Sequence, residues 1–207
     1  MSTDNTCAWA MNHELERAYH DAEWGVPVYD DQVLFEFITL EGAQAGLSWI
    51  TILKKREGYR AAFENYDLDK LVNFGEQDVE RIIEQFDVVK HRGKIASVFS
   101  NAQAAKALIE EYGSLSKALW QFVDGKPIVN QWTEMSQVPA STEQSKALSK
   151  FLKKKGFKFV GETICYAFMQ AVGMVDDHLV GCPKNNRHSL LNKNPRSIKR
   201  GFLSFNR

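Results

Sequence analysis

Apolar residues recur every three or four positions along most of the chain, which is the spacing of one buried face of an α-helix. The first stripe runs over residues 31–41, where Asp30 and Asp31 are placed to cap the helix. Ser48 is expected to cap a second helix over residues 49–57. Two further stripes fall at Val79, Ile82, Ile83 and Phe86, and at Ile95, Val98, Phe99, Ala102, Leu108 and Ile109.

The same spacing continues towards the C-terminus. Ser141 and Gln144 have the spacing of a capping box, ahead of apolar residues at 147, 148, 151 and 152. A last helix is expected over about residues 163–172, ended by Gly173. Strand-like runs are brief, as at residues 128–129, and neither a βαβ alternation nor an internal repeat is visible. The pattern predicts an all-α protein, a compact helical bundle forming one domain.

Length and composition agree with this fold class. The chain has 207 residues, of which 44% are hydrophobic and 25% are charged, values typical of a globular domain. They argue against disorder, collagen-like repeats and a membrane span. Residues 1–6 lack the basic and apolar regions of a secretory signal. Because three cysteines cannot build a disulfide framework, a cytoplasmic location is expected.

The charges balance, with 26 basic and 26 acidic residues, but they are segregated along the chain. Residues 183–207 contain lysine and arginine and no acid, and residues 146–158 form a second acid-free basic stretch. We therefore divide the chain into a domain over residues 1–183 and a basic, flexible tail over residues 184–207. A polyanionic partner is not excluded, although long-range attraction to it should be weak and binding should depend on local contacts.

Four metal-type residues lie near the two ends of the chain. Cys7 and His20 are close in sequence, and His178 and Cys182 are close enough for both to reach one ion from a single turn at the end of the last helix. Two thiolates and two imidazoles suit a closed, structural zinc site. The alternative is that the cysteines are small buried hydrophobes and the histidines are surface residues. Cys165, in an apolar helix, is expected to be a core residue.

Glu41 is the only charged residue between positions 37 and 53, and small residues follow it at 42–46. A carboxylate in apolar surroundings is costly unless it is paired. It can be a helix-end carboxylate held by backbone N–H groups or an arginine, or it can receive a cationic, donor-rich ligand.

Aromatic residues crowd the N-terminal quarter of the chain. Trp9, Tyr19, Trp24 and Trp49 all precede position 50. Singly, each is typical of a core; together with Glu41 they indicate a slot for a flat, electron-poor ring, because aromatic faces attract flat cations and stack on bases.

A glycine-flanked, lysine-rich segment connects the last two expected helices. Gly156 and Gly161 should free the backbone at both ends of a tight hairpin, and the following helix presents open N–H groups. Such a turn can bind phosphate without reading sequence. The alternative is a surface corner between two helices with a solvated lysine face.

These features occur together in long sequence motifs, and the chain resembles the 3-methyladenine DNA glycosylase I family of the helix-hairpin-helix glycosylase superfamily. The resemblance covers about residues 6–183. The matching stretches are Cys7–Trp9, Ala18–Pro27, Leu40–Thr51, Leu53–Glu57, His91–Ile95, Lys155–Gly161 and Ile164–Gln170, followed by His178 and Cys182.

The resemblance implies a monofunctional enzyme that flips 3-methyladenine out of double-stranded DNA and hydrolyses its N-glycosidic bond. The products are free 3-methyladenine and an abasic site. It also implies a helix-hairpin-helix motif and one structural zinc ion. We further expect the protein to be a monomer without membrane contact. The implied zinc ligands are Cys7, His20, His178 and Cys182.

The resemblance also implies roles for individual side chains. Glu41 would accept hydrogen bonds from the base and complement its charge. The base would stack on Tyr19 and Trp49, in a pocket shaped by Trp9 and Trp24. The wedge that fills the gap in the duplex would comprise Gln44, Gly46 and Leu47. The hairpin that holds the phosphates would comprise Gly156, Phe157, Lys158 and Gly161.

Two positions depart from the family pattern. Glu16 stands where the family often has a second pocket tyrosine, and Val175 precedes Asp176 and Asp177 where an asparagine is common. Asp176 is a minor candidate for stabilising the sugar cation, and its alternative role is that of a helix cap or a partner of His178.

Two functions of other classes remain open. A non-catalytic DNA-binding module would use the hairpin but would not need Glu41 among aromatics. A zinc hydrolase of a small substrate would lose turnover at once on chelation.

Overall fold

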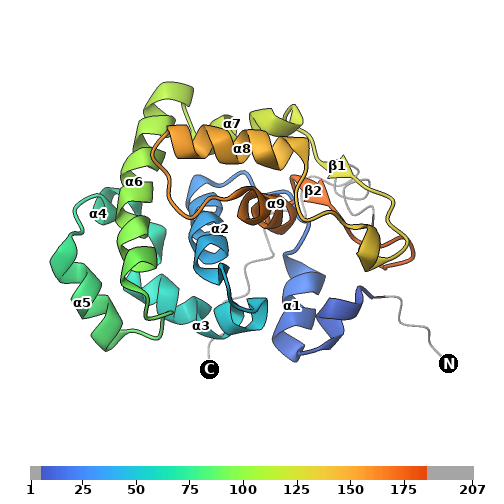
Figure 1. Cartoon of the computed structure of the whole chain (residues 1–207), viewed down its shortest axis with the longest axis horizontal. Coiled ribbons are helices and arrows are strands. Elements are labelled where there is room, and N and C mark those ends of the chain that lie inside the picture. The colour runs from blue at the N-terminus through green and yellow to red at the C-terminus, as the bar shows by residue number, and fades with distance from the viewer. Residues whose placement is uncertain (1–5, 186–207) are drawn as a thin grey trace.

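The computed structural model describes residues 6–185, and most of these are helical, as the apolar spacing predicts (Figure 1). The α-helices are α1 (Glu14–Ala22), α2 (Asp31–Gln44), α3 (Trp49–Ala62), α4 (Leu68–Leu71), α5 (Glu76–Gln85), α6 (Arg92–Tyr112), α7 (Leu115–Trp120), α8 (Glu143–Lys154) and α9 (Glu162–Ala171). Short 3₁₀ helices lie at η1 (Ala8–Met11), η2 (Glu64–Tyr66), η3 (Gln121–Val123) and η4 (Met135–Gln137). Strands β1 (Ile128–Val129) and β2 (Val175–Asp176) pair in parallel.

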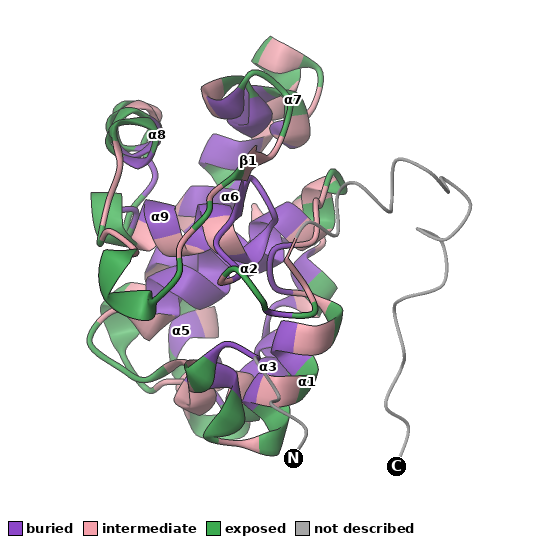
Figure 2. Cartoon of the chain, turned by 90° about the vertical axis from the view of Figure 1, so that its right-hand side faces the viewer, coloured by how far each residue is buried: buried purple, intermediate pink, exposed green. Residues whose placement is uncertain are grey.

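Helix α2 is the central element. It contacts α3, α6, α7 and α9, and every residue from Leu34 to Ala43 is buried. A helix that is apolar on almost all sides is stable only when other helices surround it. Figure 2 shows the buried residues concentrated in α2 and the helices around it. Glu41 is therefore carried into the core by a helix that is buried on all sides from Leu34 to Ala43.

Several helix ends match the predicted caps. The Asp30 carboxylate accepts a hydrogen bond from Val33 N at 3.0 Å and begins α2. Helix α3 does begin after Ser48, but it continues to Ala62, beyond the predicted residue 57. The Ser48 hydroxyl hydrogen-bonds the Thr51 hydroxyl at 2.8 Å instead of a backbone N–H. Position 48 was thus predicted correctly as the helix boundary, whereas its capping bond was not.

The capping box before α8 lies one residue later than predicted. Thr142, not Ser141, is the N-cap: its hydroxyl accepts from Ser145 N at 3.3 Å, and Ser145 Oγ accepts from Thr142 N at 2.9 Å. Ser141 instead donates to the Glu162 carboxylate at 3.3 Å, which joins the start of α8 to the start of α9. The sequence offers hydroxyls at both positions, so the capping pattern alone does not distinguish them.

After α9 the chain pairs with β1 and then turns towards α1. Asp177, directly after β2, is buried and accepts four hydrogen bonds from side chains of two segments. The donors are Asn130 Nδ2, Trp132 Nε1, Tyr166 OH and Gln170 Nε2, at 2.5–2.8 Å. This carboxylate fixes the backbone on which His178 lies.

Within residues 6–185, none of the helices is both long and apolar enough to cross a membrane. The basic tail expected at 184–207 lies outside the described residues, apart from Lys184 and Asn185.

Candidate functional site

Glu41 lies on the last turn but one of α2 and is only 3% exposed. Within the described part of the chain its Oε2 has no hydrogen-bond partner. Burial raises the pKa of this carboxyl from its ordinary value of 4.5 to about 8. Neither arginine nor backbone N–H satisfies that oxygen, which favours the ligand-binding interpretation of Glu41 over a structural one.

Aromatic rings from three helices meet beside Glu41. The Tyr19 ring of α1 lies 5.2 Å from Trp49 of α3 and 6.3 Å from Phe37 of α2, measured between centroids. Phe37 lies one turn before Glu41 on the same face of α2. Burial first, and then the charge of Glu41, raise the pKa of Tyr19 well above its ordinary value. Trp49 Nε1 is buried and, in the described residues, has no acceptor. A carboxylate oxygen and an indole N–H are thus both left for a ligand in an aromatic setting.

Arg56 joins the helices that build this site. Its Nε and Nη1 donate to the carboxylates of Glu36 and Glu23, each at 2.8 Å, and its guanidinium lies 5.2 Å from the centre of the Phe37 ring. Burial alone would lower the pKa of Arg56, but the hydrogen bonds and charges of the two carboxylates outweigh it and raise that pKa. Sequence reasoning missed this residue, because its only signal is a basic position within a matching motif.

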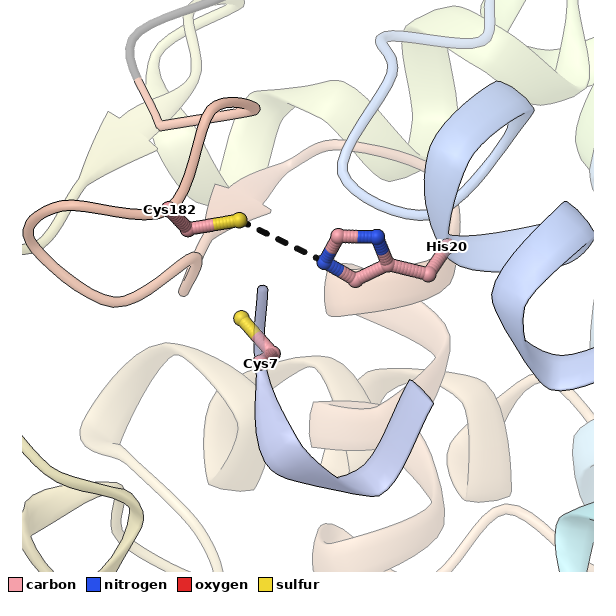
Figure 3. Close-up of side chains that lie close together, drawn as sticks. All are labelled: Cys7, His20 and Cys182. Carbon is pink, nitrogen blue, oxygen red and sulfur yellow. Dashed lines mark hydrogen bonds between the residues drawn. The ribbon is translucent and has the colours of Figure 1, made fainter. Parts of the chain in front are cut away.

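Three of the four predicted metal ligands form a buried cluster. Ligand atoms of Cys7, His20 and Cys182 lie within 4.8 Å of one another, and His20 Nε2 is 3.5 Å from Cys182 Sγ (Figure 3). Burial raises the pKa of the Cys7 thiol to about 12, and the adjacent Cys182 adds to this. The cluster joins the segment before η1, helix α1 and the loop after β2.

His178 lies beside this cluster rather than in it. Its ring is 4.9 Å from the His20 ring between centroids, and its buried Nε2 has no hydrogen-bond partner among residues 6–185. Its Nδ1 contacts Asp176 Oδ1 at 2.7 Å, just as His20 Nδ1 contacts Asp21 Oδ1 at 2.8 Å. The last helix ends at Ala171, close to the predicted end, and His178 follows β2 in irregular backbone. A backbone bond from Cys182 N to Leu179 O at 2.9 Å forms a turn between His178 and Cys182.

Trp9 and Trp24 connect the two parts of the site. The Trp24 ring lies 4.6 Å from His178 and 5.1 Å from Trp9, and Trp9 lies 6.3 Å from Tyr19. A continuous line of rings therefore runs from the histidines to Tyr19 and Trp49. The sulfur cluster and the rings near Glu41 are thus joined by packed aromatic side chains.

Gly25 permits the close approach of α1 to His178. Its φ is +74°, and an added Cβ would lie 2.8 Å from His178 Cε1. Gly25→Ala is expected to destabilise the protein by about 2–4 kcal/mol because the ring must move. The matched control is Gly125→Ala, at φ +71°, where an added Cβ would meet nothing within 4 Å in the described part of the chain and only the backbone cost of about 1 kcal/mol applies. Equal losses in urea unfolding would contradict the contact.

A tight turn over residues 155–161 joins α8 and α9. Gly156 has φ +94°, as expected, but Gly161 has an ordinary φ of −62°, and the second left-handed residue is Phe159 at +56°. The expectation that Gly161 frees the backbone by its φ is therefore wrong. Gly161 instead leaves the N-terminus of α9 without a side-chain cap. Lys158 and Phe159 are exposed at the tip, whereas Phe157 is buried.

The model of the family described as methyladenine glycosylase matches residues 9–185. The chain belongs to the methyladenine glycosylase family. It is 52% identical over 176 residues to DNA-3-methyladenine glycosylase 1 of Escherichia coli strain K12, covering 85% of this chain and 94% of that protein.

Two solved structures in the comparison have the same fold as this family member. A crystal structure of 3-methyladenine DNA glycosylase I is 51% identical with a TM-score of 0.83, covering 87% of this chain and 99% of that one. A Staphylococcus aureus structure described as the basis of 3-methyladenine recognition is 38% identical with a TM-score of 0.85. That match covers 89% of this chain and 98% of the other.

The two departures from the family pattern lie in different parts of this family member. Glu16 is buried in α1, one turn before Tyr19, and is 9% exposed. Asp176 is fully buried and accepts from both the backbone N and, at 2.7 Å, the Nδ1 side of His178. Its contacts are those of a partner of His178, the alternative that the sequence left open.

Proposed function

We propose that this protein excises 3-methyladenine from double-stranded DNA by hydrolysing the N-glycosidic bond, leaving an abasic site. The single observation that carries the proposal is Glu41, a buried carboxylate with an unsatisfied oxygen. It lies one helical turn from Phe37, whose ring packs near Tyr19, and Tyr19 in turn packs near Trp49. The names of the relatives support the same substrate. A non-catalytic DNA-binding module would have no use for this costly group.

The chemistry of the substrate fits such a site. Methylation at N3 makes the adenine cationic, so it leaves readily when the electron pair of the glycosidic bond returns to the ring. Water then adds to C1′ of the sugar and loses a proton. Little general-base help is needed, and the protein's task is to extrude the base and recognise its charge.

Glu41 is the recognition group in this proposal. Its carboxylate accepts hydrogen bonds from the extruded base and complements its charge. The base stacks against Tyr19 and Trp49, while Trp9 and Trp24 hold these rings in place. We assign Asp176 to the positioning of His178, and its catalytic role stays a prediction.

The DNA backbone meets the turn between α8 and α9, which we interpret as a helix-hairpin-helix motif. Its glycines and the open N-terminus of α9 offer N–H groups to phosphates, without reading sequence. Lys153, Lys154 and Lys158 are exposed beside it. The loop after α2, with Gln44, Gly46 and the 41%-exposed Leu47, is the wedge that fills the place of the flipped base.

We further propose that one structural zinc ion is held by Cys7, His20, His178 and Cys182. The donor set fits zinc, because two thiolates and two imidazoles complete a tetrahedral shell without an open position. Both histidines have a carboxylate at Nδ1, the arrangement that orients metal-bound imidazoles. Two adjacent buried thiols resist losing their protons together, and a divalent cation removes that penalty. The bound ion supplies cross-linking of the two chain ends and no catalytic step.

The test of the function is base release from methylated duplex DNA. The full chain should release 3-methyladenine, identified by chromatography, and leave alkali-sensitive abasic sites. We expect it to act as a monomer in the cytoplasm. Binding of DNA without release of any base would overturn the glycosylase proposal and leave the non-catalytic module. Loss of release immediately on chelation, before any change in melting temperature, would instead favour a catalytic zinc.

A further inference from the structure

Lys94 reaches from the first turn of α6 to the end of α2. Its Nζ donates to the carbonyl oxygens of Ala43, at 2.9 Å, and Ala45, at 2.6 Å. Ala43 lies in the last turn of α2, and Ala45 is its C-cap. One ammonium group therefore binds both the end of this buried helix and the first residue of the loop over 45–48.

The position makes these bonds strong. The last carbonyls of a helix lack partners within the helix and lie at the negative end of its dipole, where a cation is favoured. Lys94 is partly buried, and this burial lowers its pKa. Hydrogen bonds from a charged donor are stronger where the donor is partly removed from water than where it is fully exposed. Because both acceptors belong to the backbone, the two bonds hold main-chain atoms of α2 and of the loop directly to the Lys94 ammonium.

The loop that Lys94 holds is otherwise open. Gly46 has φ +80°, no atom of residues 6–185 lies within 4 Å of the place of a Cβ there, and Leu47 is 41% exposed. The loop's backbone bond, from Leu47 N to Gln44 O at 2.6 Å, is local. Lys94, almost fifty residues further along the chain, thus ties this loop to the rest of the fold.

The same stretch of α6 also holds the turn between α8 and α9. The Asn101 side chain donates to Lys158 O at 3.1 Å and accepts from Lys158 N at 2.8 Å. The Phe159 ring lies 6.2 Å from His91, and its Cβ would be 3.3 Å from a Cβ at Gly42. Helix α6 therefore sets the position of the loop 45–48 relative to the turn 155–161.

We propose that Lys94 is a positioning residue for duplex DNA. It fixes the distance between the loop 45–48 and the turn 155–161. At this distance the loop can enter the base stack while the turn holds the phosphates. The inference rests on the proposed function. Within the described residues, the Lys94 ammonium bonds only the carbonyls of Ala43 and Ala45 and none of Glu41, Tyr19 or Trp49, so it acts on the extrusion of the base rather than on its recognition.

The test compares duplex with single-stranded DNA. A Lys94→Met variant keeps the alkyl stem and loses the donors, and single-turnover release of 3-methyladenine is measured on the same methylated oligonucleotide, annealed or alone. We expect release from the duplex to fall about 10- to 100-fold, the effect of a small misplacement of a positioning group. Release from the single strand and binding of free 3-methyladenine should change by about threefold or less, because neither needs extrusion from a base stack.

Three variants control the comparison. Lys90→Met removes an exposed lysine close to the same helix end and should leave the ratio of duplex to single-strand rates unchanged. Lys94→Arg keeps a charged donor, so its ratio of duplex to single-strand rates should stay close to that of the wild type. If Lys94→Met does not fold, Lys94→Gln, with a shorter neutral donor, takes its place.

The possible outcomes separate the two proposals. An equal loss on both substrates, or an unchanged ratio, overturns the positioning role of Lys94. Absence of release by the wild-type protein from either substrate overturns the proposed function itself.

Discussion

Glu41→Gln is expected to lower the rate of 3-methyladenine release from DNA about 100-fold, the usual effect of removing one electrostatic contact in a desolvated site. Glutamine has nearly the same shape, but it cannot complement a positive charge, and its NH₂ group opposes the donors of the base. Affinity for abasic DNA should change far less, since no base occupies the pocket there. Single-turnover release and DNA binding are the two measurements, and equal losses in both would contradict the pocket assignment.

The same substitution should change how stability depends on pH. The carboxyl of Glu41 has a pKa of about 8 in the folded chain and about 4.5 when unfolded, so between these values the folded state retains a proton that the unfolded state has lost. Wild-type stability therefore falls as pH rises through this window, by up to about 1.4 kcal/mol per pH unit from this group. In Glu41→Gln this slope is absent. The free energy of unfolding of the variant, measured in urea, should therefore rise relative to that of the wild type between pH 5.5 and 8.5.

Glu36→Gln is the matched control, since Glu36 is another buried carboxylate on α2. Glu36 accepts from Arg56 at 2.8 Å and from Arg60 at 3.0 Å, so its loss leaves two guanidinium groups short of a counter-charge. We expect a destabilisation of about 2 kcal/mol. At pH 8.5, Glu41→Gln should thus raise the free energy of unfolding and Glu36→Gln should lower it. Stabilisation by both, or destabilisation by both, would contradict the burial of an unpaired carboxylate at position 41.

The sequence revealed Glu41 because an isolated charge in a long apolar run is conspicuous without any structure. Apolar spacing located the larger helices for a similar reason: helix formation and burial of one face depend on neighbours three and four residues away. The helix α1, which carries both Tyr19 and His20, was not predicted, and neither were the short helices α4 and α7. Helices of nine residues or fewer offer too few apolar positions for their spacing to be recognised.

The side chains that hold the site could not be predicted. The contacts of Arg56, Lys94 and Asp177 join segments far apart in sequence, and each is one of many charged residues that look alike in the chain. Which carbonyl or carboxylate lies within reach of a flexible side chain depends on tertiary packing, not on local pattern. The pairing of β1 with β2 has the same origin, because two-residue strands carry no periodicity.

Cys182→Ser is expected to abolish zinc binding and to cause the largest loss of stability among single substitutions in this chain. Cys182 lies at the C-terminal side of the cluster, where its sulfur is 3.5 Å from His20 Nε2, while Cys7 approaches from the N-terminal side. A structural zinc ion couples its binding free energy to folding, so losing a thiolate ligand should cost several kcal/mol, roughly 4 or more. The melting temperature should fall with the zinc content.

The control is Cys165→Ser, because Cys165 is also a buried, free thiol but lies in α9 with its sulfur 3.5 Å from Val160 O. It should keep one zinc ion per chain and lose only about 1–2 kcal/mol. A chelator should lower the melting temperature of the wild type and of Cys165→Ser, and leave that of Cys182→Ser nearly unchanged, since the last has no ion to lose. A wild-type protein purified with zinc in the medium, yet holding none by elemental analysis, would exclude the site. Excision should decline in parallel with unfolding. The rings of Trp24 and Trp9 lie between the cluster and Tyr19 and Trp49, so we expect loss of the cluster to disturb their packing.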